Sequence, residues 1–291
     1  MSECTLITPN RQTIKPAQKT GKVAAKETMF HCESAEAALK EILTKENPQI
    51  LSIGETHPYS DDGAKKTTLK LFADKLLPII AALGFGTLVV EGIYSDSESD
   101  LNVAAYMEGN EELETVSSRD YFPSESVNRH GQDQLLQKAK RLGVKILGGG
   151  PRTSDREVSF IYDDFLSLSD DTRLAALMQR IAKRSIEKTL PLARSGKKVA
   201  LFGGAQHNDI RTTPQTNPVS FGHHFKDHTR YKFVEVDILS PELMDKGNFE
   251  NYDYPEYERW LKTAVPESGT IMISRGKGSY TIVLPKGTLE R

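Results

Sequence analysis

The chain has 291 residues, a length that suits one large α/β domain or two small ones with ample hydrophobic core. Hydrophobic residues make up 37% of the chain and charged residues 27%, the balance of an ordinary soluble protein. A formal net charge of −2 excludes a general attraction to nucleic acid or to anionic membranes. Because no run of 18 apolar residues occurs, the sequence predicts no membrane span.

The N-terminal region carries the only information on the compartment. Two cysteines, Cys4 and Cys32, are too few for a disulfide framework, and this usage fits a reducing environment. The charged start, apolar run and cleavage site of a secretory signal are missing. These features predict a cytoplasmic protein, with export by a signal-independent route left open. Residues 1–28 are polar and mildly basic, and we expect them to form a flexible tail.

Residues 29–291 are expected to form a single α/β domain, because strand and helix patterns alternate along them. An amphipathic helix over 34–45 comes first, with Ser34 as its N-cap. Short apolar runs then predict five strands, and a glycine-containing turn predicts a C-terminal hairpin. The strands cover 50–53, 87–90, 144–147, 198–202 and 231–239, and the hairpin joins 270–274 to 279–284.

Helical periodicity between the strands predicts a mostly parallel central sheet flanked by helices, with an antiparallel C-terminal edge. Pro78 is expected to kink the helix after the first strand without ending it, since Gly84 is a better stop signal. Residues 108–122 are expected to be an acidic, mobile connection, and residues 221–228 a loop. The other expected helices cover 96–107, 128–142, 156–194 in two or three pieces, and 255–264.

Three of the predicted strands end on residues that can carry chemistry. Glu55 and His57 follow the first strand, Glu91 follows the second, and His207 follows the fourth. Both histidines close a Gly-x-x-His sequence. Because the carboxyl ends of parallel strands meet at one edge of a sheet, we expect these four residues to form one site. A Glu-x-His at a strand end can also be a simple helix cap, but three such ends favour a site.

The four residues suit two forms of water activation. His57, Glu91 and His207 could bind one divalent metal ion, such as Zn, Mn or Co, with a position left open for water. Without a metal, His57 could take a proton from water while a carboxylate such as Glu55 orients the imidazole. In both forms the catalytic residues are Glu55, His57, Glu91 and His207, and the target is a polarised carbonyl.

Other candidates are isolated residues. Arg152, which follows a triple glycine at a strand end, could bind a substrate carboxylate or an oxyanion, or could simply start a helix in solvent. His224 and His228 have the i, i+4 spacing of helical metal ligands, but the glycine and polar residues around them favour a loop. The chain has no dinucleotide fingerprint, no G-x-S-x-G elbow and no H-E-x-x-H motif.

The sequences Ile53-Gly-Glu-Thr-His57, Val90-Glu91 and Gly204-Ala-Gln-His207 resemble the superfamily of erythromycin esterases, TIKI-type metalloproteases and ChaN-like haem-uptake proteins. Related domains occur in bacterial toxins, including the Ras-cleaving endopeptidase domain of multifunctional autoprocessing toxins. The resemblance covers roughly residues 49–207. It implies an active site of Glu55, His57, Glu91 and His207, with a bound metal as in TIKI proteins or without one as in the esterases. In the esterases, an arginine shortly after the first histidine assists the reaction. In this chain, the nearest basic residues after His57 are Lys65 and Lys66.

The sequence therefore predicts a hydrolase that cleaves an amide, peptide or ester bond in a peptide or small-molecule substrate. The resemblance to ChaN keeps an alternative open, a protein that binds haem or another ligand with an axial residue such as Tyr59. A third alternative is an interaction module with a decayed site. The complete set of four residues argues against it.

Overall fold

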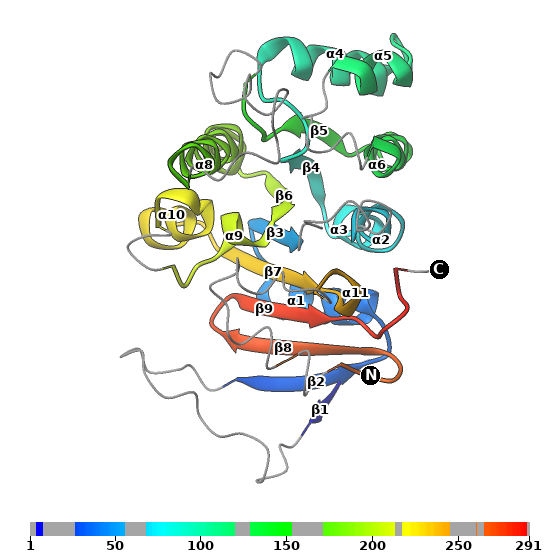
Figure 1. The fold of residues 1–291 in the computed structure, drawn as a ribbon, viewed down its shortest axis with the longest axis vertical. Helices are drawn as coiled ribbons and strands as arrows, with labels where there is room; N and C mark the ends of the chain where they lie inside the picture. Colours follow the sequence, from blue (N-terminus) through cyan, green and yellow to red (C-terminus); the bar gives the residue numbers. More distant parts are fainter. Residues whose placement is uncertain are drawn as a thin grey trace.

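A nine-stranded mixed β-sheet forms the centre of the computed structural model (Figure 1). The strands lie in the order β1-β2-β8-β9-β7-β3-β6-β4-β5. Pairing is parallel from β9 through to β5 and antiparallel among β1, β2, β8 and β9. This architecture confirms the predicted α/β class. The structure describes residues 4–7, 27–55, 68–119, 129–152, 171–212, 217–244, 260 and 265–289.

Every strand that the apolar runs predicted is present, and two more precede them in the chain. The nine strands are β1 Cys4–Ile7, β2 Thr28–Cys32, β3 Ile50–Glu55, β4 Phe85–Val90, β5 Lys145–Gly148, β6 Lys198–Gly204, β7 Phe233–Leu239, β8 Thr270–Gly276 and β9 Ser279–Val283.

The helices lie between the strands, and none within the described ranges has the length and apolar content that a membrane crossing needs. The α-helices are α1 Ala35–Glu46, α2 Thr68–Leu71, α3 Leu77–Ala82, α4 Ser97–Glu108, α5 Leu113–Arg119, α6 Arg129–Leu142, α8 Asp171–Arg194, α9 Ala205–Asn208, α10 Phe221–His228 and α11 Pro241–Met244. A π-helical segment, Phe72–Leu76, and a 3-10 turn, Asn217–Val219, complete the set.

Helices cover both faces of the sheet (Figure 1). On one face, Leu51 and Phe202 belong to the same buried cluster as Leu136 of α6. On the other face, Leu201 packs in a second cluster with Phe225 of α10. Successive side chains of each strand therefore point into different cores. Consequently a strand end can present side chains to either helical layer.

Pro78 distorts its helix without ending it, as predicted. The helix runs from α2 to α3 but widens to a π-helical turn over Phe72–Leu76, directly before the proline. The proline ring would clash with the carbonyl four residues earlier, and the Leu77 N–H instead bonds to Phe72 O, five residues back. The helix then ends next to Gly84, which has φ +89°.

The N-terminus corrects two predictions. Residues 4–7 of the expected flexible tail form β1, which pairs antiparallel with β2, while residues 8–26 lie outside the described part of the chain. Cys4 and Cys32 face each other across these strands and form a disulfide, with Cα atoms 4.1 Å apart. Because disulfides persist in oxidising compartments, the two cysteines no longer support the inference of a reducing one, and the cytoplasmic location stays a prediction.

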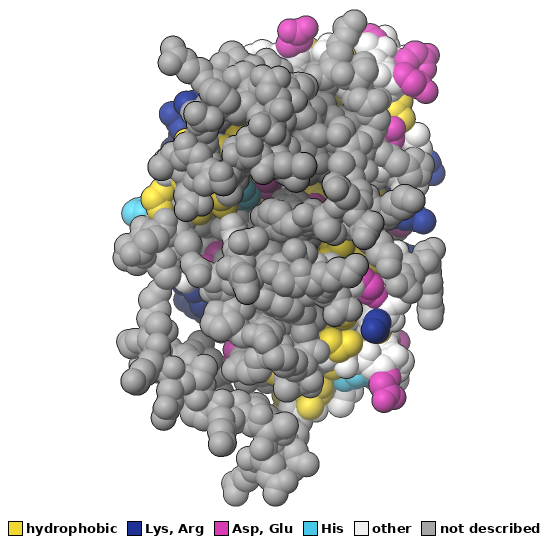
Figure 2. Space-filling model, in the orientation of Figure 1, with side chains coloured by type: hydrophobic (Ala, Val, Ile, Leu, Met, Phe, Trp, Pro, Cys, Tyr) yellow, Lys and Arg dark blue, Asp and Glu magenta, His cyan; other side chains and the backbone are white. Residues whose placement is uncertain are grey.

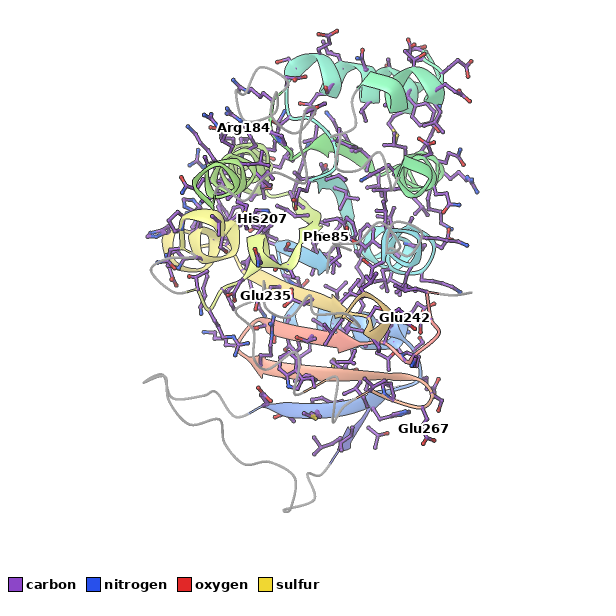
Figure 3. All side chains as sticks on the ribbon, in the orientation of Figure 1. Phe85, Arg184, His207, Glu235, Glu242 and Glu267 are labelled. Carbon is purple, nitrogen blue, oxygen red and sulfur yellow. A yellow bond between two sulfur atoms is a disulfide. The ribbon has the colours of Figure 1, made fainter. Side chains whose placement is uncertain are left out.

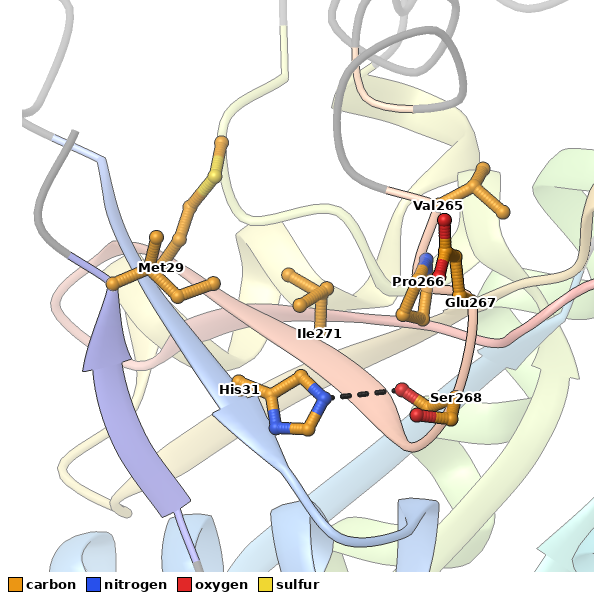
Figure 4. Close-up of a pocket in the computed structure, with 8 residues that line it drawn as sticks. Met29, His31, Val265, Pro266, Glu267, Ser268 and Ile271 are labelled. Atoms are coloured by element: carbon orange, nitrogen blue, oxygen red, sulfur yellow. Dashed lines mark hydrogen bonds between the residues drawn. The ribbon is translucent and has the colours of Figure 1, made fainter. Parts of the chain in front are cut away.

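The N-terminal strands also change the edge of the sheet. β2 pairs with β8, so the predicted C-terminal hairpin lies inside the sheet and β1 forms its edge. A pocket of about 300 Å³ opens here, with Met29 and Ile271 in its lining (Figure 4). In that pocket His31 Nε2 donates a hydrogen bond to Ser268 O at 3.0 Å. The antiparallel part of the sheet therefore comes from both ends of the chain.

Two segments expected to be loops are helices. In the acidic connection, α5 forms because Val116 is fully buried against the core. In the histidine-rich segment, Ser220 caps α10 by accepting from His223 N–H at 3.3 Å. Phe221 and Phe225, four residues apart, then pack on the same side of that helix. In both segments polar side chains outnumber the few apolar ones that set the helix face, which hides the helical periodicity in the sequence.

A buried polar cluster, made of Glu235, Asp237, Arg275 and Ser279, joins β7 to β8 and β9. Arg275 is 1% exposed and donates to Glu235 Oε1 at 2.7 Å and to Asp237 Oδ2 at 2.8 Å. Glu235 also accepts from the Ser279 hydroxyl and, at 2.6 Å, from Ile210 N–H. Burial raises the pKa of Glu235 to about 8, against the opposing charge of Arg275.

This raised pKa makes folding stability depend on pH. Between about pH 4.5, the ordinary value, and about pH 8, the unfolded chain loses a proton from Glu235 that the folded protein keeps. The contribution of Glu235 to stability is therefore complete at low pH and declines as the pH rises through this window. We expect Glu235→Gln to reduce that decline by up to about 1.4 kcal/mol per pH unit. Urea unfolding at several pH values measures it, with the exposed Glu267→Gln as control. Equal slopes for wild type and Glu235→Gln would contradict the prediction.

Candidate functional site

The three strand ends that the sequence singled out are neighbours in the sheet. β6 lies between β3 and β4, and it pairs in parallel with both. Glu55 is the last residue of β3, Glu91 directly follows β4, and His207 lies in α9 directly after β6. The predicted convergence of these backbone segments is therefore confirmed. His57 lies outside the described residues.

Glu91 and His207 form a largely buried pair at this edge. Glu91 Oε1 lies 3.4 Å from His207 Nε2, and the two side chains are 14% and 5% exposed. The other carboxylate oxygen accepts from Gly204 N–H at 2.7 Å, and His207 Nδ1 donates to Val219 O at 2.8 Å. Figure 3 shows His207 next to the end of β3, on the side of the sheet that α8 and α10 cover. The backbone thus fixes the orientation of both side chains.

This geometry allows two states of the imidazole. Because Nδ1 carries a proton toward Val219 O, Nε2 either holds a second proton that faces Glu91 or offers its lone pair. A separation of 3.4 Å is longer than a good N–H···O hydrogen bond, which measures about 2.7–3.2 Å. It matches the spacing of two ligand atoms that each lie about 2.1 Å from one tetrahedral metal ion. Glu91 and His207 therefore fit a metal as well as an ion pair.

The glycines of both Gly-x-x-His segments are required by close packing. A Cβ on Gly203, next to the second segment, would lie 2.2 Å from Glu91 Oε2. A Cβ on Gly54 would lie 2.6 Å from Asp237 Oδ1 and 2.7 Å from Asn208 Nδ2. Glycine at these positions lets Glu91 lie flat against β6 and lets α9 approach β3.

Glu55 approaches the same edge from the opposite face of the sheet. It is 3% exposed and accepts a hydrogen bond from the hydroxyl of Thr68 in α2. This partner differs from those of Glu91 and His207, which bond to Gly204 N–H and Val219 O. Within the described residues, no group of three His, Cys, Asp or Glu side chains is placed to hold a metal ion. A metal bound by Glu91 and His207 would therefore need a further ligand such as the predicted His57.

Two residues near the site were not singled out from the sequence. Thr68 positions the Glu55 carboxylate, but the two lie thirteen positions apart in the chain. Asn208 directly follows His207, and its side chain is fully buried with neither Oδ1 nor Nδ2 hydrogen-bonded to the described residues. Leaving such a group unpaired costs about 1–3 kcal/mol, so its amide is suited to a bound water or substrate. The only feature of the sequence that could have pointed to Asn208 as a site residue is its position next to His207.

The remaining candidates lie elsewhere. Arg152 follows β5, the strand beyond Glu91 at the edge of the sheet, and its side chain is exposed. Its role in substrate binding stays a prediction. Tyr59, Lys65 and Lys66 lie outside the described part of the chain.

Comparisons with known proteins give a distant fold similarity. No known protein family and no curated protein matches the sequence. Among solved structures, a Bacillus cereus protein has a TM-score of 0.45 and 10% identity, over 85% of this chain and 92% of that chain. RRSP, a MARTX toxin effector domain from Vibrio vulnificus, has a TM-score of 0.42 and 17% identity, over 60% of this chain and 30% of that chain. ChaN of Campylobacter jejuni, which binds haem, has a TM-score of 0.42 and 13% identity, over 68% and 84%.

Proposed function

We propose that the protein is a hydrolase that cleaves an amide, peptide or ester bond with water activated by Glu55, His57, Glu91 and His207. The observation that carries this proposal is the largely buried Glu91–His207 pair, held by backbone groups where three parallel strands end. Burial of two ionisable side chains is costly unless they are paired, so such a pair at a strand edge is typical of a functional site.

Each residue has a role in this proposal. His57 accepts the proton of the attacking water, and Glu55 orients that imidazole or carries the proton onward. Glu91 keeps His207 in place, and a protonated His207 stabilises the negative charge that develops on the carbonyl oxygen. Arg152 binds a carboxylate of the substrate. The buried amide of Asn208 holds water or substrate next to His207.

A divalent ion such as Zn, Mn or Co would fit the same residues. Glu91 Oε1 and His207 Nε2 have the spacing of two ligands, and His57 would supply a third. Val219 O and Gly204 N–H would then orient the two ligands from outside, as second partners of metal-binding side chains commonly do. A bound ion would lower the pKa of its water and polarise the carbonyl.

The proposal is tested with purified full-length protein on a panel of aryl esters, aminoacyl amides and fluorogenic peptides. We expect Glu55→Ala, His57→Ala, Glu91→Ala and His207→Ala each to abolish turnover while the protein stays folded. His31→Ala, which removes a histidine on the far edge of the sheet, should keep wild-type turnover. Retained turnover in any two of the four variants would overturn the proposal.

Elemental analysis and a chelator distinguish the two forms of water activation. If a metal takes part, the purified protein contains about one divalent ion per chain and the chelator removes turnover until metal is added back. If the four residues activate water without a metal, turnover is insensitive to the chelator. Metal that is lost from His207→Ala, but not from His31→Ala, would locate the ion at this site independently of activity.

A further inference from the structure

A second pocket, of about 510 Å³, lies between the end of α8 and α10. Its lining includes Arg194 of α8, His224 and His228 of α10, and Arg230 and Tyr231 of the segment that leads into β7. These residues come just before β6 and β7 in the chain, at the amino ends of the parallel strands. The candidate hydrolytic site lies at the opposite, carboxyl ends.

The ionisable side chains that line this pocket are basic. Among the described residues, two guanidinium groups and two imidazoles line it, and no carboxylate does. Neither Arg194 nor Arg230 forms an ion pair with a carboxylate of the described residues. Asp227, the nearest acidic residue on α10, is paired with His223 at 2.9 Å on the neighbouring turn.

The ends of the two helices do not account for these cations. Basic residues often lie at helix C-termini because the last carbonyls are unpaired there. In α8, however, Ser195 and Lys197 donate to Leu192 O at 2.8 and 3.1 Å. In α10, the Thr229 hydroxyl donates to Phe225 O at 2.6 Å. The arginines are therefore not needed as hydrogen-bond caps.

The two histidines do not make a metal site here. Their ring centroids lie 5.5 Å apart, but the described residues supply no third His, Cys, Asp or Glu ligand. The neighbouring guanidinium groups would repel a cation. Burial lowers the pKa of His224, and the charges of His228 and His223 lower it further, so at neutral pH its ring is uncharged with one N–H to donate.

We propose that this pocket binds a small oxyanion with two negative charges, such as a phosphate group. Arginine guanidinium groups bind phosphate or carboxylate oxygens through two parallel hydrogen bonds, and the imidazole N–H and Tyr231 hydroxyl supply further donors. Figure 2 shows histidine and hydrophobic atoms together at the left edge of the molecule, where α10 lies, so the region is open to solvent. An open site of this kind binds a single anionic group weakly. A ligand with two anionic groups should bind more tightly than a ligand with one.

The test is a titration of the full-length protein with inorganic phosphate at constant ionic strength, followed by NMR signals of the histidine rings. Substitutions His224→Gln and His228→Gln identify the two signals. We expect both signals to shift and saturate in wild type, and pyrophosphate to act at lower concentration. The double variant Arg194→Ala/Arg230→Ala should weaken binding at least about tenfold, since charge-assisted hydrogen bonds are lost.

Matched controls separate a built site from general charge attraction. Lys138→Ala/Lys145→Ala removes two positive charges near β5 and should leave the affinity unchanged. Succinate in place of phosphate shows whether the bound group is a phosphate or a dicarboxylate, and both results support an oxyanion site. Histidine signals that do not move, or equal affinities for the two double variants, would overturn the proposal. Thermal unfolding confirms that both variants are folded.

Discussion

Glu91→Gln is expected to lower hydrolytic turnover by about 10²- to 10⁴-fold while the free energy of unfolding stays close to the wild-type value. The glutamine oxygen can accept from Gly204 N–H, as Glu91 Oε2 does at 2.7 Å. Its NH₂ group then faces His207 Nε2, which can accept because Nδ1 donates to Val219 O. The hydrogen bonds survive, and the negative charge that holds a protonated imidazole or a metal ion is lost.

This comparison needs initial rates on the best substrate of the panel and urea unfolding of the same preparations. Glu98→Gln, on the exposed first turn of α4, removes an equal charge from a solvent-facing side chain and should change neither quantity. Wild-type turnover in Glu91→Gln would show that the Glu91–His207 pair only stabilises the fold. A large loss of stability together with turnover would point to the same conclusion.

Arg275→Met should lower the free energy of unfolding by about 3–5 kcal/mol, because it removes the cation that the Asp237 carboxylate and Glu235 share inside the sheet. Arg275 donates to Glu235, to Asp237 and, at 3.2 Å, to Tyr280 O. Methionine fills a similar volume, so the loss reports mainly the missing cation. Glu235 already keeps its proton at neutral pH, since burial raises its pKa to about 8. Asp237 then carries most of the penalty.

Urea unfolding measures this loss against two references. Lys232→Met removes the cation of an ion pair with Glu46 in which the lysine side chain is 51% exposed, and it should cost at most about 1 kcal/mol. Adding Asp237→Asn to Arg275→Met should recover part of the stability, because the unpaired charge is removed. A loss for Arg275→Met no larger than that for Lys232→Met would contradict the buried ion-pair account.

The identity of the strands was predictable, and their order was not. The apolar run before Glu55 and the one before His207 each mark a buried strand from local sequence alone. That β6 inserts between β3 and β4 depends on crossovers through α2, α3 and α8, which periodicity does not encode. The N-terminal strand β1 escaped notice for a related reason. It is four residues long, and its pairing with β2 is fixed by a partner cysteine 28 residues away.

The candidate site was predictable in its residue types and in the strands that supply them. Gly-x-x-His and a glutamate after a buried strand are local signals, and they located Glu91 and His207 at neighbouring strand ends. The partners that orient these side chains were not predictable, because Val219 O and Gly204 N–H are backbone groups without a sequence signature. The buried polar cluster was missed because Glu235 and Arg275, on β7 and β8, are separated in the sheet by β9.

The position of the His57 imidazole in a crystal structure of the full-length protein tests the central claim most directly. A shared site requires that ring to lie within about 3 Å of Glu91, His207 or a common metal ion, or within reach through a single water. We predict this arrangement, with Glu55 approaching the ring from the opposite face of the sheet. An imidazole that points into solvent, or that is separated from His207 by packed apolar side chains, would contradict water activation by these residues.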